Sequence, residues 1–600
     1  MAELRPAVLA LTRGGAQTAR MLGHELHGLA GRVEAADVTF DDMMAHCSAL
    51  FAAGRPIVGL CAAGILIRAV APLLASKHDE PPVIAVSEDG SHVVPLLGGH
   101  RGANRMARDI ARQLGGTAAV TTAGDTVFGI ALDEPPEGWA LANPQDAKSA
   151  AASMLRDGGA VLKGEQPPWS DIPCAGHVTL EGTLERREGG PMHLVYHPKR
   201  VAIGVGCARD CPPDELFSLV EQTLTEANLA SASIATVATV DLKADEPAVL
   251  ALARRLGLPL RLFTAEELET FTPRLANPSG VVFAEIGCHG VAEAAALATT
   301  GPTARLKVDK RKTARATCAL AIGDAPILHP AGRKPGSVRL VGIGPGQAAW
   351  RTPEASRLVA GSDELVGYGL YLDLLGPLAR GKPQHRFPLG EETERCRFAL
   401  ERAGEGFDVA LVCSGDAGIY AMGALVHELL DRAPSSLSDA ARRVEVISAP
   451  GISALQGAAA RAGAPLGHDF CAISLSDLMT PWPTIEHRIE AAATGDFVIA
   501  FYNPVSMRRR TQLAHARDIL LQHRPADTPV MLASHIGRTD ETIRYRRLHQ
   551  LQVDEIDMLT TVLVGSSQSR LYRRGTGPVF YTPRGYGDRR PGTPPTGSPT

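Results

Sequence analysis

The chain has 600 residues, of which 45% are hydrophobic and 21% charged, and its formal net charge is -4. This length exceeds what one hydrophobic core normally serves, so we expect several domains. The charge balance gives no indication of a nucleic-acid partner, and no uninterrupted apolar run is long enough to cross a bilayer. Ten cysteines without a regular framework are typical of a reducing cytoplasm, so we expect a cytoplasmic protein with no membrane partner.

Short apolar runs alternate with helical patterns from the start of the chain, which is typical of α/β domains. The opening segment lacks the basic region of a signal peptide and is expected to form a strand. Residues 81–100 are expected to form two strands around a turn at Glu88-Asp89-Gly90. Apolar residues then recur at helical spacing until Leu114, where Gly115 can end a helix. A further strand is expected within 116–125.

The pattern weakens between 133 and 199, which leaves open a connecting region or a small subdomain. A new α/β unit begins at Val201, and within it Thr264 and Glu267 have the spacing of a capping box. The segment LHPAGRKPGS at 328–337 is rich in proline, glycine and basic residues, and further strands are expected after it, within 338–582. The predicted divisions are an N-terminal α/β domain (1–132), a middle region (133–199), a second α/β domain (200–327), a linker (328–337), a large C-terminal domain (338–582) and a disordered tail (583–600).

Four loops in the C-terminal domain follow predicted strands, at the edge where open α/β sheets bind ligands. They read GIGPG at 342–346, SGDAGIY at 414–420, PGISALQ at 450–456 and FYNP at 501–504. Glycine permits close backbone approach, and Asp416 offers a carboxylate to hydroxyl or amino groups. Each loop alone is weak evidence, whereas the four in this order within one domain are much more specific.

Together with GYGLYLDLL, SGDAGIYAMG and FYNPVSMRR, these loops resemble the tetrapyrrole methyltransferase family, in the branch that methylates precorrin-3B at C(17) of the corrin ring. The resemblance covers Val338–Tyr581. It implies S-adenosylmethionine as cofactor, two α/β subdomains with the cofactor in the cleft between them, and a homodimer. The positions that it implies for cofactor binding are Pro345, Ser414, Gly415, Asp416, Ile419, Ser453, Ala454, Tyr502, Asn503 and Gly537.

Methyl transfer from a sulfonium is an in-line displacement in which the electron-rich tetrapyrrole carbon is itself the nucleophile. The protein then contributes mainly the positioning of two reactants, and no activated side chain is required. The resemblance implies that C(17) methylation accompanies ring contraction. Asp477 is a candidate acid or base for that step, and an N-cap of the following helix is the alternative interpretation.

Two further clusters lie in the first half of the chain. His100 and Asn104 stand at an expected helix N-terminus, which favours an anionic group, and His289 precedes another helix. For His100, a loop histidine with satisfied hydrogen bonds and no ligand is the alternative interpretation. The segment ARLKVDKRKTAR, residues 304–315, is strongly basic. A short basic run of this kind is usually a solvated edge. Beside a methyltransferase for a substrate with many carboxylates, it supplies four candidate substrate-binding residues: Lys307, Lys310, Arg311 and Lys312. Cys207 and Cys211 lack a second Cys or His pair, so no metal site is predicted.

Two longer segments surround His100 and His289: VSEDGSHVVPLLGGHRGANRMARDIA and IGCHGVAEAAAL. They resemble the N- and C-terminal parts of the cobalt-precorrin-5A hydrolase family, and the resemblance implies an enzyme that opens a δ-lactone and releases acetaldehyde. The hydrolysis candidates are Glu88, His100 and His289. The loop at 98–104 departs from the expected Gly-Gly-Ala-Asn, so a non-catalytic tetrapyrrole-binding module is the alternative.

The leading prediction is therefore a corrin-pathway fusion protein in cobalamin biosynthesis. It joins a hydrolase-like N-terminal half to a precorrin-3B C(17)-methyltransferase of α/β fold. One alternative is a C(17)-methyltransferase for cobalt-precorrin-3. Another is a nicotinamide-dependent oxidoreductase, which rests on the glycine-rich loop alone. For that, the third glycine comes one residue early, and Asp363 and Glu364 precede the second strand instead of ending it.

Overall fold

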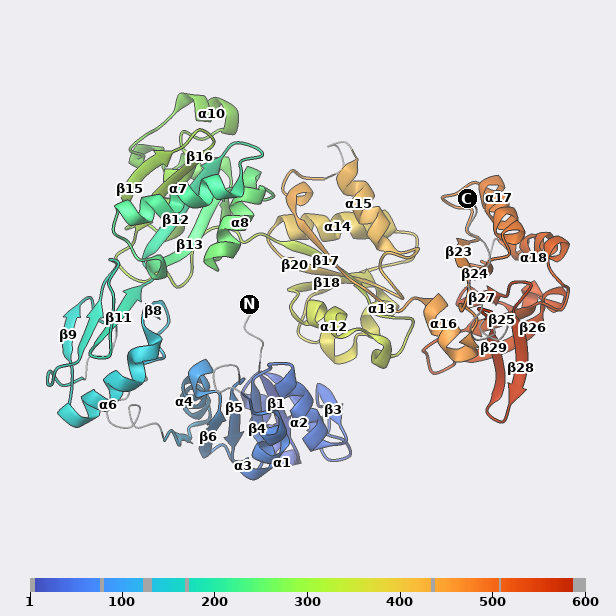
Figure 1. Cartoon of the computed structure of the whole chain (residues 1–600), viewed down its shortest axis with the longest axis horizontal. Helices are drawn as coiled ribbons and strands as arrows, with labels where there is room; N and C mark the ends of the chain where they lie inside the picture. Colours follow the sequence, from blue (N-terminus) through green and yellow to red (C-terminus); the bar gives the residue numbers. More distant parts are fainter. Residues whose placement is uncertain are drawn as a thin grey trace, which may run out of the picture. The chain divides into compact units, whose positions relative to one another are not determined.

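The computed structural model describes residues 6–75, 80–121, 132–167, 172–432, 437–506 and 509–585. The chain forms two compact units, Met1–Pro335 and Gly336–Thr600, each built from several sheets flanked by helices (Figure 1). The predicted strand within 116–125 is present as β7 (Thr117–Ala118). Its last part, 122–125, lies outside the described residues, as does most of the predicted tail, from 586 onward.

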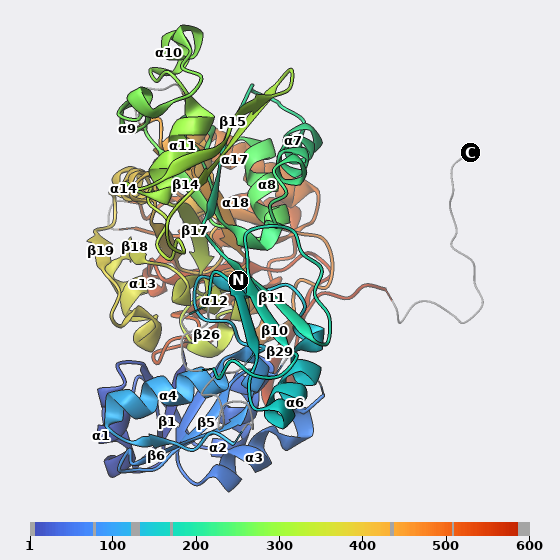
Figure 2. The same cartoon turned by 90° about the vertical axis from the view of Figure 1, so that its left-hand side faces the viewer.

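The first sheet of unit one is doubly wound, with helices on both faces. Its strands run in the order β3 (Val38–Phe40), β2 (Glu25–Leu29), β1 (Ala7–Ala10), β4 (Ile57–Leu60), β5 (Val83–Val86), β6 (His92–Leu97) and β7. β5 and β6 are the predicted antiparallel pair around the Glu88 turn. Helices α1 (Arg13–Met21) and α4 (Ala103–Leu114) cover one face, and α2 (Met43–Ala52) and α3 (Ala63–Val70) cover the other (Figure 2). α4 ends at Gly115 as predicted, with a φ of 70°.

The region between 133 and 199 contains its own four-stranded sheet. The strand order is β8 (Trp139–Leu141), β11 (His193–Pro198), β10 (Thr179–Gly182) and β9 (Val161–Gly164). Helix α6 (Ala147–Asp157) packs on it through Ala150 and Met154, which are buried with Tyr196. The Tyr196 hydroxyl donates to the Leu132 carbonyl at 2.7 Å, so the only polar atom of this buried ring is satisfied.

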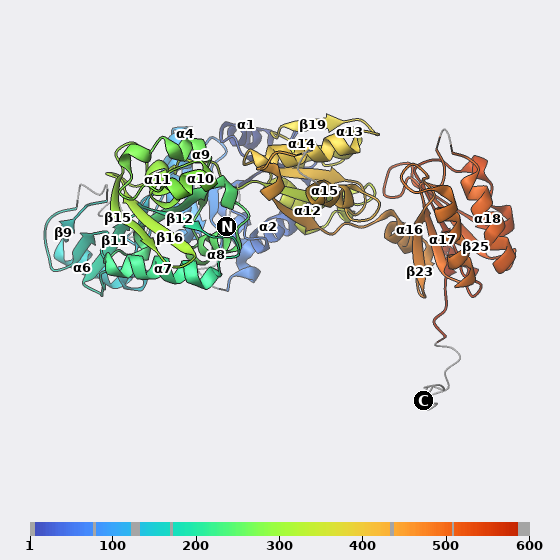
Figure 3. The same ribbon diagram turned by 90° about the horizontal axis from the view of Figure 1, so that it is seen from above.

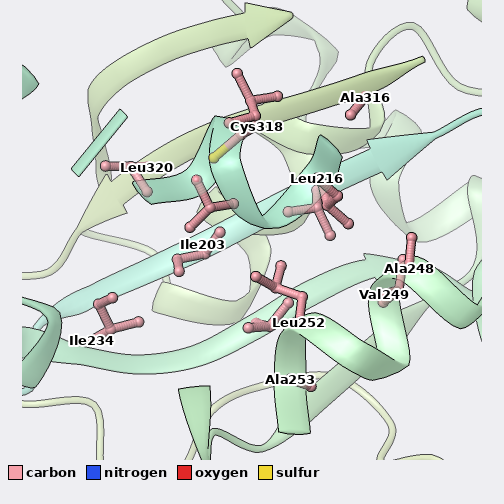
Figure 4. Packing of buried hydrophobic residues seen from close by; sticks show 14 of the residues in the cluster. Ile203, Leu216, Ile234, Ala248, Val249, Leu252, Ala253, Ala316, Cys318 and Leu320 are labelled. Atoms are coloured by element: carbon pink, nitrogen blue, oxygen red, sulfur yellow. The ribbon is translucent and has the colours of Figure 1, made fainter. Parts of the chain in front are cut away.

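The third sheet of unit one has the order β14 (Leu260–Phe263), β13 (Ile234–Val240), β12 (Val201–Cys207), β16 (Ala316–Ile322) and β15 (Arg305–Lys312). Side chains alternate along β12, so Ile203 and Val205 pack against α7 (Pro213–Glu226) and α8 (Pro247–Leu256) (Figure 4). Gly204 faces α11 (Val291–Thr300) on the other side. A Cβ at that position would lie 1.9 Å from the Ala292 carbonyl oxygen, so only glycine permits this helix-to-sheet distance.

Part of the predicted linker, 328–337, is held within unit one. The backbones of Leu262 and Arg333 exchange two hydrogen bonds, of 2.7 and 2.9 Å, which extend the sheet beyond β14. Gly332 packs over the Phe263 ring, where a Cβ would lie 2.6 Å from Cζ. Ser337 already opens the first strand of unit two, so the connection between the units is shorter than its composition predicts.

The first sheet of unit two is entirely parallel, in the order β19 (Gln384–Phe387), β18 (Glu364–Tyr368), β20 (Asp408–Cys413), β17 (Ser337–Gly342) and β21 (Glu445–Ala449). Helices α14 (Glu392–Gly404) and α15 (Met422–Asp431) bury one face, and α12 (Pro353–Ala360) and α13 (Gly369–Asp373) bury the other. Because both faces are covered, β20 is apolar after Asp408, and β17 is apolar apart from Ser337 and Arg339.

The second sheet of unit two is mixed, in the order β23 (Phe470–Ser474), β24 (Val498–Tyr502), β27 (Thr560–Val564), β25 (Pro529–Ser534) and β26 (Thr542–Arg547). Helices α17 (Trp482–Thr494) and α18 (Gln512–His523) lie on one face and α16 (Ala454–Ala462) on the other (Figure 3). A small third sheet, β22 (Gly463–Ala464), β29 (Gly577–Tyr581) and β28 (Arg570–Arg574), adds Phe580 to the core around α16.

A chain of polar side chains lies on one face of the first sheet at β2. The buried His27 places Nε2 3.0 Å from Glu25 Oε2 and Nδ1 2.7 Å from His46 Nε2, and Arg55 also binds Glu25. The hydrogen bond from His27, with the charge of Arg55, holds the pKa of Glu25 at about 2. Burial, followed by the charges of His27 and Arg55, lowers the pKa of His46 to about 4.

The His46 ring predicts an acid-sensitive first sheet. Its pKa falls from 6.5 to about 4 on folding, so the unfolded chain binds more protons in this window and stability is lost as the pH falls from 6.5 towards 4. The loss is on the order of 1 kcal/mol, because the ring is partly exposed and solvent screens its charge. His46→Gln, which cannot titrate, should abolish this loss. Hydrogen-exchange mass spectrometry of peptides from β2 and α2 at pH 7 and pH 4.5, corrected for intrinsic rates, measures it. An equal loss in both proteins would contradict the assignment.

Candidate functional site

Three of the four predicted loops meet at the carboxyl edge of the first sheet of unit two. Strands β20, β17 and β21 are neighbours, so the loops that follow them are also neighbours. Loop 342–346 leaves β17, loop 414–420 leaves β20, and loop 450–453 leads from β21 into α16. This is the edge at which ligands bind in open α/β sheets.

The glycines of these loops pack backbone against backbone. A Cβ on Gly342 would lie 2.5 Å from the Gly415 carbonyl oxygen, and a Cβ on Gly451 would lie 2.2 Å from the same atom. Gly344 and Gly415 also exchange two hydrogen bonds, of 3.1 and 2.9 Å, with φ values of 77° and 68°. The glycine-rich character of the opening loop therefore comes from contact with the two neighbouring loops.

The Asp416 carboxylate ties two of these loops together. Oδ1 accepts the Gly418 amide of its own loop at 2.8 Å, and Oδ2 accepts the Gly451 amide of the next loop at 2.8 Å. Hydrogen bonds to a carboxylate are stronger than those between neutral groups, so Asp416 fixes the spacing of the loops. The Thr352 hydroxyl, which also caps α12, donates to the Pro450 carbonyl at 3.1 Å and holds the same loop from its other side.

Contacts with the second sheet complete this region. Gly346 lies against Gly537, where a Cβ on Gly346 would be 2.5 Å from the Gly537 carbonyl oxygen. The Tyr420 hydroxyl donates to the Ala472 carbonyl at 2.8 Å, and the Tyr420 and Tyr502 rings lie 5.2 Å apart. Tyr502 accepts the Leu455 amide at 3.0 Å. The fourth loop, after β24, is thus brought to the other three.

The remaining residues predicted to bind the cofactor differ in what their side chains do. Pro345 is buried against α16, and Ser453 is only 2% exposed and accepts the Gln456 amide as N-cap of that helix. Ser414 and Ala454 are partly exposed. Asn503 donates to the Ser474 hydroxyl at 3.1 Å.

The side chains that face outward at this edge are largely apolar. Ile419 is 39% exposed and Tyr420 is 53% exposed, although both lie in a loop held by Asp416. Tyr420 lies within the predicted loop 414–420 but is not among the residues predicted to bind the cofactor. Its φ of 50° and its bond to the second sheet are tertiary features that have no sequence signal. The edge therefore offers an apolar surface beside fixed backbone groups.

Asp477 lies in the second sheet region, after β23. It accepts a hydrogen bond of 3.0 Å from Gln512 Nε2 and stands 3.7 Å from Arg509 Nη1. The alternative interpretation as a helix N-cap is wrong, because α17 begins five residues later with Pro481 at its cap. Proline at this position presets the φ that the helix start needs and offers no side-chain cap.

The geometry argues against a dinucleotide site at the opening loop. A short 3-10 turn separates the loop from α12, so the glycines do not open a helix as they do in the dinucleotide fold. Glu364 is the first residue of β18 and therefore lies at the opposite, amino edge of the sheet. Its carboxylate binds Arg402 and His385 there, away from the loops.

The hydrolysis candidates in unit one lie beside two different sheets. Glu88 follows β5 in the first sheet, where its Oε1 accepts the Thr12 hydroxyl at 2.7 Å. His289 lies beside the third sheet, just before α11, and its Nδ1 is 2.9 Å from Glu269 Oε1. The backbone of His100 forms a 3-10 turn ahead of α4, and Asn104 lies in the first turn of α4, while the side chain of His100 is outside the described structure.

The predicted basic run forms β15, an edge strand of the third sheet. Lys310 is engaged within the fold, since its Nζ donates to the Asn277 carbonyl at 2.9 Å and its amide donates to the buried Glu293. Arg311 lies 3.8 Å from Glu226. Lys307 and Lys312 are exposed. Of the four candidates, these two have the ammonium groups most accessible to a ligand.

No group of three or more His, Cys, Asp or Glu side chains is placed to hold a metal ion within the described ranges. In the same ranges, no single helix has the length and apolar character needed to span a membrane. The bent pair α10 (Gly280–Ile286) and α11 meets the length and composition criteria when taken together.

Comparison with known proteins assigns most of these regions to families. Residues 337–552 match the tetrapyrrole (corrin/porphyrin) methylases, residues 45–125 match the cobalamin synthesis G N-terminal family, and residues 201–321 match the cobalamin synthesis G C-terminus. A precorrin-3B C(17)-methyltransferase from Sinorhizobium sp is 42% identical over 252 residues, which are 42% of this chain and 97% of that protein.

A cobalt-factor III methyltransferase from Priestia megaterium is also 42% identical, over 42% of this chain and 45% of that protein, so this chain spans about half of that relative. Among solved structures, the methyltransferase CobJ is 38% identical, with a TM-score of 0.39, over 41% of this chain and all of that one.

The convergent loops of unit two coincide with the part of the chain that matches these methyltransferases over nearly their whole length. The chain therefore belongs to the tetrapyrrole methylase family through residues 337–552, and it carries cobalamin synthesis G domains in the preceding half.

Proposed function

We propose that this protein acts in corrin-ring biosynthesis for cobalamin and that unit two methylates precorrin-3B at C(17), with ring contraction, using S-adenosylmethionine. The observation that carries the proposal is the convergence of the four loops, two of them joined by the Asp416 carboxylate, within a region 42% identical to a precorrin-3B C(17)-methyltransferase. The metal-free substrate is the first choice. The cobalt-containing form is the alternative, supported by the equally similar cobalt-factor III methyltransferase.

The residues present fit S-adenosylmethionine. Ile419 and Tyr420 offer exposed apolar surface for an adenosyl group, next to backbone groups held by Asp416. We assign the binding surface to Pro345, Ser414, Gly415, Asp416, Ile419, Ser453, Ala454, Tyr502, Asn503 and Gly537. The side chains of Asp416 and Ser453 support this surface indirectly: Asp416 holds two loops together, and Ser453 caps the start of α16. The cofactor supplies a methyl group on a sulfonium, and the protein orients the two reactants.

For the N-terminal half we propose a lactone hydrolase of the cobalamin synthesis G type, acting on a tetrapyrrole. The two domain matches at 45–125 and 201–321 support this proposal. Covalent linkage raises the effective concentration of one site's product at the other. We further propose the division into an N-terminal α/β domain, a middle region, a second α/β domain and a methyltransferase domain, with the segment around Arg333 assigned to unit one and Ser337 to the methyltransferase domain. We also propose Asp477 as an aid to ring contraction, Lys307 and Lys312 as contacts for substrate carboxylates, and a homodimer formed through the methyltransferase domain.

The proposal predicts methyl transfer by the full-length protein. Incubation with precorrin-3B and S-adenosylmethionine should give a product 14 mass units heavier by mass spectrometry, and cobalt-factor III should react more slowly. A parallel titration with NADH should show no binding. Failure to methylate either tetrapyrrole, or binding of NADH in place of S-adenosylmethionine, would overturn the assignment.

Asp416→Asn should weaken S-adenosylmethionine binding about 10- to 100-fold. The amide cannot accept from both the Gly418 and Gly451 N–H groups, and each hydrogen bond to a charged group contributes about 1.5–3 kcal/mol. Isothermal titration calorimetry measures the change. Asp439→Asn, which removes an exposed carboxylate paired with Arg443 in the same unit, is the control and should bind normally. Equal affinity in all three proteins would contradict a structural role for Asp416 in the site.

Gly451→Ala should reduce S-adenosylmethionine affinity about 5- to 150-fold, because overpacking of this kind costs about 1–3 kcal/mol. The new methyl group would meet the Gly415 carbonyl oxygen at 2.2 Å and separate the two loops. Gly575→Ala adds the same methyl group in open space, at a φ that alanine adopts, and should leave affinity unchanged. Unaltered binding by Gly451→Ala would show that the loops need no close backbone contact.

A further inference from the structure

The third sheet of unit one carries a histidine–carboxylate pair at the end of β14. Glu269 is the last residue of the short helix α9 (Ala265–Glu269), and His289 stands between α10 and α11. Glu269 Oε1 and Oε2 lie 2.9 and 3.1 Å from His289 Nδ1. Both side chains are about one-third exposed, so the pair is neither buried in the core nor freely solvated.

Additional contacts fix the orientation of the imidazole ring. Glu269 Oε2 accepts the backbone amide of His289 at 2.9 Å and the hydroxyl of Thr272 at 2.9 Å. The Phe283 ring stacks on the imidazole with centroids 4.4 Å apart. Within the described part of the chain, Nε2 of His289 has no hydrogen-bond partner. A histidine oriented through Nδ1 by a carboxylate, with Nε2 left available, is the arrangement of a general base.

An open surface hollow of about 590 Å³ borders the pair on the side of Glu269, which is the member that lines it. Its lining consists of Thr264, Ala265, Glu266, Glu269, Thr270 and Gly287, so it lies between the start of α9 and the turn that precedes His289. The volume falls within the range of small-molecule sites. The backbone around the hollow is held by the predicted Thr264–Glu267 capping box and by Gly287, whose φ is 91°.

The charges at the hollow indicate what can enter it. Glu266 and Glu269 are both acidic. Burial raises the pKa of Glu269, but the hydrogen bonds from His289 and Thr272 outweigh it and bring the pKa below its ordinary value. A free carboxylate would be repelled by this lining, whereas an uncharged acyl group such as a lactone or ester would not. The site therefore suits the neutral acyl part of a tetrapyrrole and not its acetate or propionate arms.

We propose that His289 is the general base of the lactone hydrolase in the N-terminal half, with Glu269 as its positioning residue. This inference rests on the proposed function of that half. His289 Nε2 takes a proton from water while the water oxygen bonds to the lactone carbonyl carbon. The ring C–O bond of the lactone then breaks, and its oxygen receives the proton back from Nε2. The immediate products are a carboxylic acid and an alcohol. Acetaldehyde follows when the C–C bond between the carbinol carbon and the macrocycle breaks: the hydroxyl proton leaves, the oxygen forms the aldehyde C=O, and the macrocycle carbon keeps the electron pair and takes up a proton. No external oxidant or reductant is needed in either step.

The test uses the full-length protein with cobalt-precorrin-5A and follows acetaldehyde release together with the mass of the tetrapyrrole. His289→Gly should lower kcat at least 100-fold, and added imidazole should restore part of the activity, which a purely structural role of His289 would not allow. Glu269→Gln should lower kcat about 10-fold or more with little change in KM. Glu285→Gln removes an exposed carboxylate on α10 and serves as the matched control, with unchanged activity.

The outcomes separate this inference from the proposed function. If the wild-type protein releases acetaldehyde but His289→Gly and Glu269→Gln retain full kcat, the dyad is not the hydrolytic centre. Loss of activity in Glu88→Gln alone would move the centre to the first sheet. If the wild-type protein binds cobalt-precorrin-5A without hydrolysis, the hydrolase proposal fails and the dyad fails with it, while methylation of precorrin-3B by unit two stands unaffected.

Discussion

The site in unit two depends on close backbone contact between three loops at one sheet edge. Gly342 and Gly451 approach the Gly415 carbonyl oxygen to distances that exclude any Cβ on either residue. The Asp416 carboxylate bonds across the gap between the second and third loops. Neither feature is sufficient alone, since glycine loops without a tie are flexible and a carboxylate without close loops has no second amide to bind. Their combination turns the ends of three neighbouring strands, β17, β20 and β21, into one continuous surface.

The second sheet contributes through a small number of contacts. Gly346 meets Gly537, and Tyr420 bonds to the backbone of β23 while its ring lies against Tyr502. The side chains of Ile419 and Tyr420 stay exposed here. Their loop is held in place by hydrogen bonds from backbone amides to the Asp416 carboxylate and does not depend on burying these two side chains. An exposed apolar surface on a rigid backbone is what a reaction based on positioning needs, and the geometry provides it without an activated nucleophile.

Unit one distributes its polar residues differently. Glu88 and His289, which sequence patterns suggest for one reaction, lie beside different sheets with separate hydrophobic cores. Lys310, one of four candidates for substrate binding, uses its amine to hold the loop at Asn277. The sequence does not distinguish a substrate-binding lysine from a structural one, because the same basic run results whether its side chains face solvent or donate hydrogen bonds to a neighbouring loop.

The amino-acid sequence by itself determined the α/β class, the main strands of unit two, the capping box at Thr264 and the order of the four loops. These features depend on local periodicity and on short-range hydrogen bonds, which are encoded within a few residues. Only the tertiary structure decided that Asp416 reaches Gly451, that Asp477 is no helix cap, and that Glu269 orients His289. These pairings join residues up to 35 positions apart, and chain connectivity alone does not specify which side chains meet after the sheets have packed.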